Sequence, residues 1–177
     1  SVLGSRATTL LAEVKTDADL YLLAVSDQAI AEIAEQLPAH LSGIVVHCSG
    51  ATAIDALQDF QRYGVAYPPH SLTKHGPVDL ASIPFGIEGN TANTADQLMA
   101  FMRPISQASF PCSSPQRLAL HTAAVFANNF ANSLFQISYD ILKENNLSFD
   151  LLRPIILETA QKVQAHEPRT VQTGPAQ

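Results

Sequence analysis

The chain has 177 residues, of which 46% are hydrophobic and 15% charged, a composition typical of globular rather than disordered proteins. Its formal net charge is −6 and no lysine and arginine cluster offsets it, which argues against nucleic-acid binding. No apolar run approaches the roughly 20 residues that cross a bilayer, and no signal peptide opens the sequence. Small molecules and protein partners are therefore the expected ligands. The two cysteines lack metal-site spacing and fit a reducing cytoplasm, the expected location.

Apolar runs and helical patterns alternate through the first two-thirds of the chain. The run from Asp19 to Val25 predicts a strand buried on both faces, and the pattern up to Leu37 predicts a helix with Asp27 as its N-cap. Strands that are joined through helices pair in parallel by right-handed crossovers, so the pattern predicts a mostly parallel open α/β sheet. Further strands are expected at 43–48, 64–67, 84–89 and 106–110, and further helices at 53–63 and 95–102.

The last third of the chain predicts helices only. Ser113 is an expected helix N-cap, and Gln116 stands where it completes a capping box. No breaker follows until Asn145–Asn146, which predicts one helix of about 30 residues, on the order of 45 Å long. A second helix is expected at 150–165. The chain is therefore expected to divide into a sheet domain, 1–112, and an all-α domain, 113–177.

Polar side chains recur among apolar ones in the expected long helix. His121, Asn128 and Asn132 are separated by about two turns and one turn of an α-helix, so we expect them on one side of it. Their apolar neighbours predict a buried helix, where an unpartnered imidazole or carboxamide costs about 1–3 kcal/mol. Either a ligand or a neighbouring helix must satisfy them. If a ligand does, His121 and Asn128 are candidate catalytic residues, because imidazoles exchange protons near neutral pH.

Small or polar residues follow four of the expected strands. In open α/β sheets, ligands bind beyond the carboxyl ends of the strands, which predicts that these residues form the rim of a binding site. The alternative is that they only turn the chain. The candidate positions are Ser26 and Asp27, then Ser49, Gly50 and Ala51, then 68–71, and finally 88–90.

The sequence lacks the glycine-rich turns that hold phosphates. None of its eight glycines belongs to a Gly-x-Gly-x-x-Gly or a Walker motif. If the sheet binds a dinucleotide, we expect the first strand and its glycine-rich turn to be missing, with Ser5 and Arg6 ending the second strand. These two residues favour the 2′-phosphate of NADP, although Arg6 is equally well explained as a surface residue. His47, His70 and His75 lack metal-site spacing, so no metal is expected.

Five segments, in chain order, carry a resemblance to a known family: Leu20–Asp27, Val46–Ala51, Ile83–Glu88, His121–Phe130 and Thr173–Ala176. They resemble an uncharacterised bacterial family that joins a Rossmann-like NADP-binding domain to a C-terminal helical domain of unknown function. The family is akin to pyrroline-carboxylate reductase and deazaflavin-dependent NADP reductase. Members of the family often have the loop sequence His-Pro-Leu-Gln-Thr-Phe. In this chain the corresponding loop, Tyr67–Leu72, has the sequence Tyr-Pro-Pro-His-Ser-Leu, which weakens a catalytic role for that loop.

These observations predict an NADP-dependent oxidoreductase that transfers a hydride to or from a small carbonyl or imine compound in a cleft between the two domains. Ser5 and Arg6 are expected to bind the 2′-phosphate, Ser26, Asp27 and Ser49–Ala51 to border the cofactor, and His121 with Asn128 to face the substrate. The long helix is expected to pack against a second copy in a homodimer. The alternative is a non-catalytic Rossmann-like dimer with a ligand-binding or regulatory role, in which His121 contributes only to stability.

Overall fold

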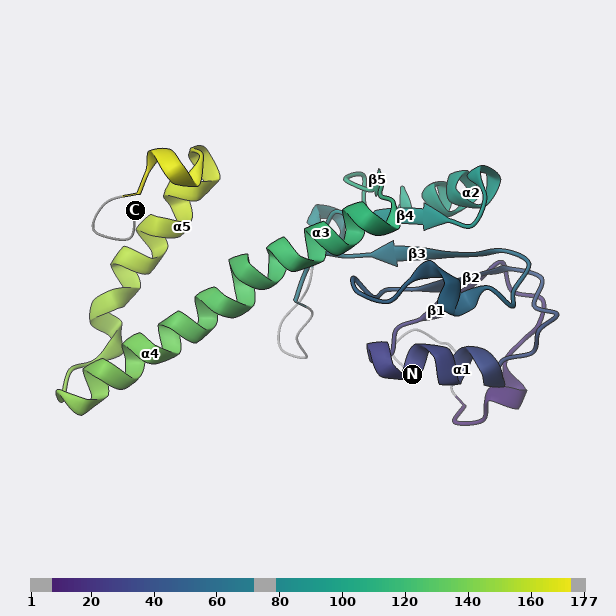
Figure 1. Ribbon diagram of the computed structural model, residues 1–177, viewed down its shortest axis with the longest axis horizontal. Helices are drawn as coiled ribbons and strands as arrows, with labels where there is room; N and C mark the ends of the chain where they lie inside the picture. Colours follow the sequence, from purple (N-terminus) through teal and green to yellow (C-terminus); the bar gives the residue numbers. More distant parts are fainter. Residues whose placement is uncertain (1–7, 72–78, 173–177) are drawn as a thin grey trace. The chain divides into compact units, whose positions relative to one another are not determined.

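A computed structural model describes residues 8–71 and 79–172 of the chain (Figure 1). The backbone forms two compact units, Ser1–Val125 and Phe126–Gln177. Within the described ranges, no helix is both long and apolar enough to span a membrane.

The first unit is built on a five-stranded sheet whose strands lie side by side in chain order. β1 (Leu20–Leu23), β2 (Ile44–His47) and β3 (Tyr63–Tyr67) run parallel to one another. All four residues of β2, three of them β-branched, are buried, as expected of a strand in a sheet that is covered on both faces. The predicted mostly parallel α/β sheet is confirmed.

One strand pair departs from the predicted parallel arrangement. β4 (Gly86–Gly89) lies antiparallel to β3, whereas β5 (Phe110–Pro111) lies parallel to β4. A parallel neighbour needs a long crossover, usually a helix. In the described part of the connection between β3 and β4, the only regular element is the short 3₁₀ turn Leu80–Ser82, so no crossover helix is seen there.

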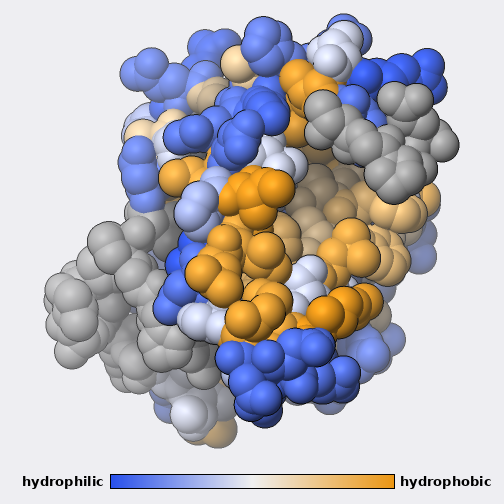
Figure 2. Space-filling view, turned by 90° about the vertical axis from the view of Figure 1, so that its left-hand side faces the viewer, coloured by the Kyte–Doolittle hydropathy of each residue, from blue (hydrophilic) through white to orange (hydrophobic). Residues whose placement is uncertain are grey.

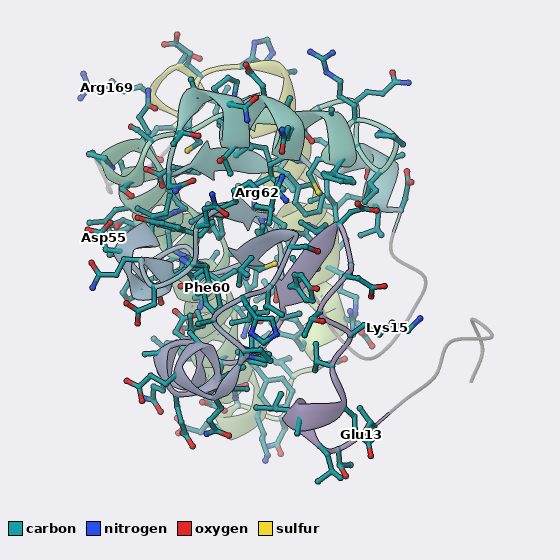
Figure 3. All side chains as sticks on the ribbon, turned by 90° about the vertical axis from the view of Figure 1, so that its right-hand side faces the viewer. Glu13, Lys15, Asp55, Phe60, Arg62 and Arg169 are labelled. Carbon is teal, nitrogen blue, oxygen red and sulfur yellow. The ribbon has the colours of Figure 1, made fainter. Side chains whose placement is uncertain are left out.

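Helices cover both faces of the sheet. α1 (Ile30–Gln36) packs on one face, in the same apolar cluster as Val45, and α2 (Ala92–Met102) packs on the other, in the cluster that contains Val46. Neighbouring residues of β2 thus point to opposite faces, which is the period of a strand. Figure 3, which looks from the end where β3 begins, shows α2 and α1 on opposite sides of the sheet.

Two short helical predictions are corrected. Asp27 is not the N-cap of α1, because a 3₁₀ turn, Asp27–Ala29, precedes the helix and Ala29 stands at the N-cap position of α1. Ser26 stands at the N-cap position of the 3₁₀ turn and forms no side-chain hydrogen bond there. The helix expected at 53–63 is only the 3₁₀ turn Ile54–Leu57. The rest of the connection to β3, which begins at Tyr63, forms turns and bends.

The predicted long helix is confirmed at 31 residues. It consists of α3 (Ser114–Ala124), the π-helical segment η5 (Val125–Phe130) and α4 (Ala131–Glu144), without a break. The Oε1 atom of Gln116 accepts a 2.9 Å hydrogen bond from the Ser113 N–H, as the capping box predicts.

The expectation of a buried helix is wrong for the single chain. Neither α4 nor α5 (Arg153–Ala165) contains a buried residue. Phe126 and Leu134 are 64% and 62% exposed, and Figure 2 shows hydrophobic residues gathered on one face of the molecule. A unit of this size, made of a helix pair, has no second layer with which to cover its apolar side chains.

Candidate functional site

Two segments of the predicted rim leave the sheet side by side, at the carboxyl ends of two parallel strands. Ser26–Asp27 follows β1 and Ser49–Ala51 follows β2, and these two strands are parallel neighbours in register. The first pair and Ala51 are exposed, whereas Ser49 and Gly50 are buried. The rim therefore combines three accessible positions with two buried ones.

His121, in the second half of α3, packs directly on this buried centre. An ideal Cβ built on Gly50 would lie 2.4 Å from Nδ1 and 2.6 Å from Cγ of the imidazole. Real Cβ atoms do not approach other atoms so closely, so only glycine allows the ring to lie here. Gly50 and His121, two residues singled out from the sequence for different reasons, are thus brought into contact.

Tyr67, at the carboxyl end of β3, is the hydrogen-bonding partner of His121. Its hydroxyl lies 3.1 Å from Nδ1, and the two rings meet edge to face with centroids 5.8 Å apart. Burial raises the pKa of the Tyr67 phenol, and the nearby charges of Asp27 and Cys112 act in the same direction. The phenol therefore keeps its proton at neutral pH. The pairing of Tyr67 with His121 was not predicted, because nothing in the local sequence indicates a partner 54 residues away.

His47, the last residue of β2, lies under the rim in a neutral state. It is fully buried, and burial together with the Arg117 charge lowers the pKa of its imidazole to about 4. The Ser49 N–H donates to Nδ1 of His47 at 3.1 Å, so Nε2 carries the remaining proton. The Ser49 hydroxyl accepts hydrogen bonds from the N–H groups of Ala51 and Thr52 at 3.1 and 2.9 Å. Ser49 thereby shapes the turn that carries Gly50.

A buried ion pair ties the start of α3 to the sheet. Arg117 is only 2% exposed, and its Nη2 atom lies 3.4 Å from Oε2 of Glu88 in β4. The same nitrogen donates a 3.0 Å hydrogen bond to the carbonyl oxygen of Thr52. Glu88 in turn accepts a 2.8 Å hydrogen bond from the Ser114 N–H, close to the positive end of the helix. These contacts hold α3, and with it His121, against the loop after β2. Arg117 was not predicted: one arginine in a helix start usually indicates a solvated position.

The remaining predicted site residues belong to other parts of the chain. Asn128 is exposed in the second unit, where its Nδ2 donates to Oδ1 of Asn129 at 3.0 Å. The seven-residue step from His121 to Asn128 ends within the π-helical segment η5, whose turns are wider than those of an α-helix. Ser5 and Arg6 lie outside the described residues.

Family models match both parts of the chain. Residues 3–72 match a Rossmann-like domain, and residues 83–177 match a domain of unknown function, DUF2520. None of the curated proteins matches the chain significantly.

Solved structures are similar over nearly the whole chain. A Bacteroides fragilis protein described as a candidate NADP oxidoreductase is 39% identical, with a TM-score of 0.83 over 96% of this chain. A Thermotoga maritima protein is 23% identical, with a TM-score of 0.74 over 92% of the chain. The chain spans 66% and 65% of the lengths of these two proteins. An imine reductase variant from Myxococcus stipitatus, in complex with NAD⁺, shares the fold at 15% identity, with a TM-score of 0.55 over 99% of this chain and 65% of its own.

Proposed function

Since the chain belongs to the DUF2520 family, with a Rossmann-like domain before it, we propose that it is an NADP-dependent oxidoreductase that transfers a hydride to or from a small carbonyl or imine compound. The observation that carries the proposal is the position of His121. Its half-buried imidazole lies at the edge where the parallel strands end, which is where open α/β sheets bind their ligands. The similarity to a Bacteroides fragilis protein described as a candidate NADP oxidoreductase supports the same reaction class.

The residues present fit the cofactor in part. Ser26, Asp27 and Ala51 offer exposed polar and small groups beside the buried Ser49 and Gly50. We infer that these five residues border the nicotinamide end of the dinucleotide, which supplies or takes up the hydride when bound. Ser5 and Arg6 are proposed for the 2′-phosphate.

No glycine of the described residues leaves space for a pyrophosphate. A Cβ built on any of them would meet protein atoms at 3.0 Å or less, and the one on Gly50 would meet His121 itself. We assign no pyrophosphate contact to these residues.

In this proposal, His121 donates a hydrogen bond or a proton to the oxygen or nitrogen on which negative charge develops. Asn128 would orient the substrate carbonyl or the nicotinamide amide. The test is activity of the full-length protein with NADPH and a panel of small oxo and imino acids. His121→Ala is expected to lower turnover by the 10²–10⁴-fold typical of a lost general acid, whereas unchanged turnover would remove His121 from the mechanism.

We propose further that the protein is a cytoplasmic homodimer that pairs through its C-terminal helices. The apolar side chains of α4 and α5 are exposed in the single chain, including Leu134, Ile137 and Ile155 at 62%, 56% and 58%. Exposed apolar surface of this extent is uncommon in monomers and typical of interfaces. Both cysteines are free thiols, which is compatible with the proposed reducing compartment.

The second candidate function is a non-catalytic ligand-binding or regulatory dimer with the same fold. It is favoured by the contact of His121 with Tyr67 and Gly50, since these neighbours would explain a purely structural imidazole. In that case His121→Ala lowers stability and leaves no activity to lose. Comparing the free energy of unfolding with turnover in the same variant separates the two functions.

A further inference from the structure

We propose that Tyr67 is a positioning residue that donates its phenolic hydrogen to Nδ1 of His121 and thereby keeps the neutral imidazole protonated on Nε2. The catalytic consequence rests on the proposed function of His121. The hydrogen bond and the tautomer depend only on the chain itself and are tested separately.

The geometry places Tyr67 and Gly50 together on the Nδ1 side of the ring. The phenolic oxygen lies 3.1 Å from Nδ1, and the Gly50 backbone is so close to Nδ1 and Cγ that a Cβ there would lie 2.4 and 2.6 Å from them. Within residues 8–71 and 79–172, no hydrogen bond is formed by Nε2 of His121. One ring nitrogen is therefore held by the protein, and the other is left for a ligand.

The direction of the hydrogen bond follows from the burial of Tyr67. The residue is 6% exposed, and in the described ranges Nδ1 of His121 is the only hydrogen-bonding partner of the hydroxyl. If Nδ1 carried the proton, the buried phenolic hydrogen would have no acceptor there, and unmet buried donors are costly. If Nδ1 accepts, both groups are satisfied. A neutral imidazole that accepts at Nδ1 must carry its proton on Nε2.

The fixed tautomer determines what His121 presents to a substrate. An Nε2–H is a donor, suited to a carbonyl oxygen or an imine nitrogen that gains negative charge. The opposite tautomer would present a lone pair and repel the same atom. Tyr67 thus acts through His121 rather than on the substrate, as the outer residues of metal and acid–base sites do.

The experiment is nitrogen NMR of histidine-labelled protein, above the pH at which its imidazoles are protonated and without cofactor. Each tautomer has a distinct pair of ring-nitrogen shifts, and His121→Gln assigns the signal. Wild-type His121 is expected in the Nε2–H form. Tyr67→Phe is expected to reduce the ratio of Nε2–H to Nδ1–H on the order of fivefold, as the loss of one neutral hydrogen bond implies. The matched control is Tyr63→Phe, at the opposite end of the same strand, which is expected to leave the ratio unchanged.

An Nδ1–H tautomer in the wild-type protein would overturn the proposal without any variant. So would an unchanged ratio in Tyr67→Phe, provided that its amide spectrum is that of the folded protein. The proposed function fails separately, if no turnover is found with any substrate while the tautomer behaves as expected. With turnover present, Tyr67→Phe is expected to lower kcat about fivefold with little change in KM.

Discussion

His121 occupies the space that a side chain at Gly50 would need: a Cβ there would lie 2.4 Å from Nδ1 and 2.8 Å from Cβ of the histidine. This contact joins the loop after β2 to the helix that follows β5. Residue 50 must be a glycine because the imidazole ring of His121 lies against its backbone. The position of His121, and any function that depends on it, is therefore sensitive to the smallest enlargement at residue 50.

Gly50→Ala is expected to lower the free energy of unfolding by about 1–3 kcal/mol, the usual cost of overpacking. Urea denaturation measures this change. His121→Ala in the same chain should restore part of the loss, because it removes Nδ1 and Cγ but keeps a Cβ 2.8 Å away. Strictly additive effects of the two substitutions would contradict the direct contact. Ala51→Ser, at the exposed neighbour, is the control.

Arg117→Ala is expected to destabilise the protein by about 3–5 kcal/mol, because it leaves Glu88 without its buried cation and the Thr52 carbonyl without its donor. The measurement is again the denaturation midpoint and slope. Arg103→Ala, at an exposed arginine after α2, should change stability by less than about 0.5 kcal/mol. Equal small effects at both positions would show that the ion pair does not anchor α3.

Stability is expected to depend on pH through His47. Its pKa is lowered from 6.5 to about 4 in the folded protein, so the unfolded chain binds the extra proton first. The free energy of unfolding should therefore fall as the pH drops from about 6.5 to about 4 and level off below that, by an amount on the order of 3 kcal/mol.

His47→Gln should flatten this pH profile, and His70→Gln, at an exposed histidine, should leave it unchanged. The measurement is the midpoint of urea denaturation at several pH values between about 4 and 7. If the wild-type and His47→Gln profiles had the same slope between these pH values, the buried neutral imidazole would not be the cause.

Leu134→Glu is expected to convert a homodimer into monomers, because it places a charge on the exposed apolar surface of α4. Light scattering after gel filtration measures the mass. Glu144→Gln, at the end of the same helix, is the matched control and should leave the dimer intact. A wild-type protein that is monomeric at all concentrations would refute the assembly itself.

The elements that are predictable from the sequence are those with a strong local pattern. The apolar run of β2 and the capping box at Ser113 each identify an element from neighbouring residues alone, and both are found as predicted. The antiparallel β4 was not predicted, because strand direction depends on the path of a connection whose sequence has no clear pattern. The π-helical turns of η5 were missed for a similar reason: the apolar spacing of Val125–Phe130 is compatible with an ordinary α-helix.

The site was predictable only in part because its contacts join distant segments. The ends of the parallel strands could be placed together, which identified Gly50 and its neighbours. The expected rim segment 88–90 is a wrong placement, because the antiparallel β4 carries its carboxyl end to the side where β3 begins, with Gly89 opposite Gly64. The partners Tyr67 and His121 are 54 residues apart, and Thr52 and Arg117 are 65 apart. A single sequence carries no signal of such pairs. Tyr67, a tyrosine directly before two prolines at a strand end, is the position where a polar tip could have been suspected.

The most direct test of the proposed oxidoreductase is binding of the reduced cofactor to the full-length protein. We expect NADPH to bind saturably, with NADH weaker, and His121→Ala to retain binding, since the imidazole is assigned to the substrate and not to the dinucleotide. Fluorescence titration of NADPH, repeated with NADH, measures both affinities. Saturable binding with a preference for NADPH supports the account; the absence of saturable binding of either nucleotide would contradict it.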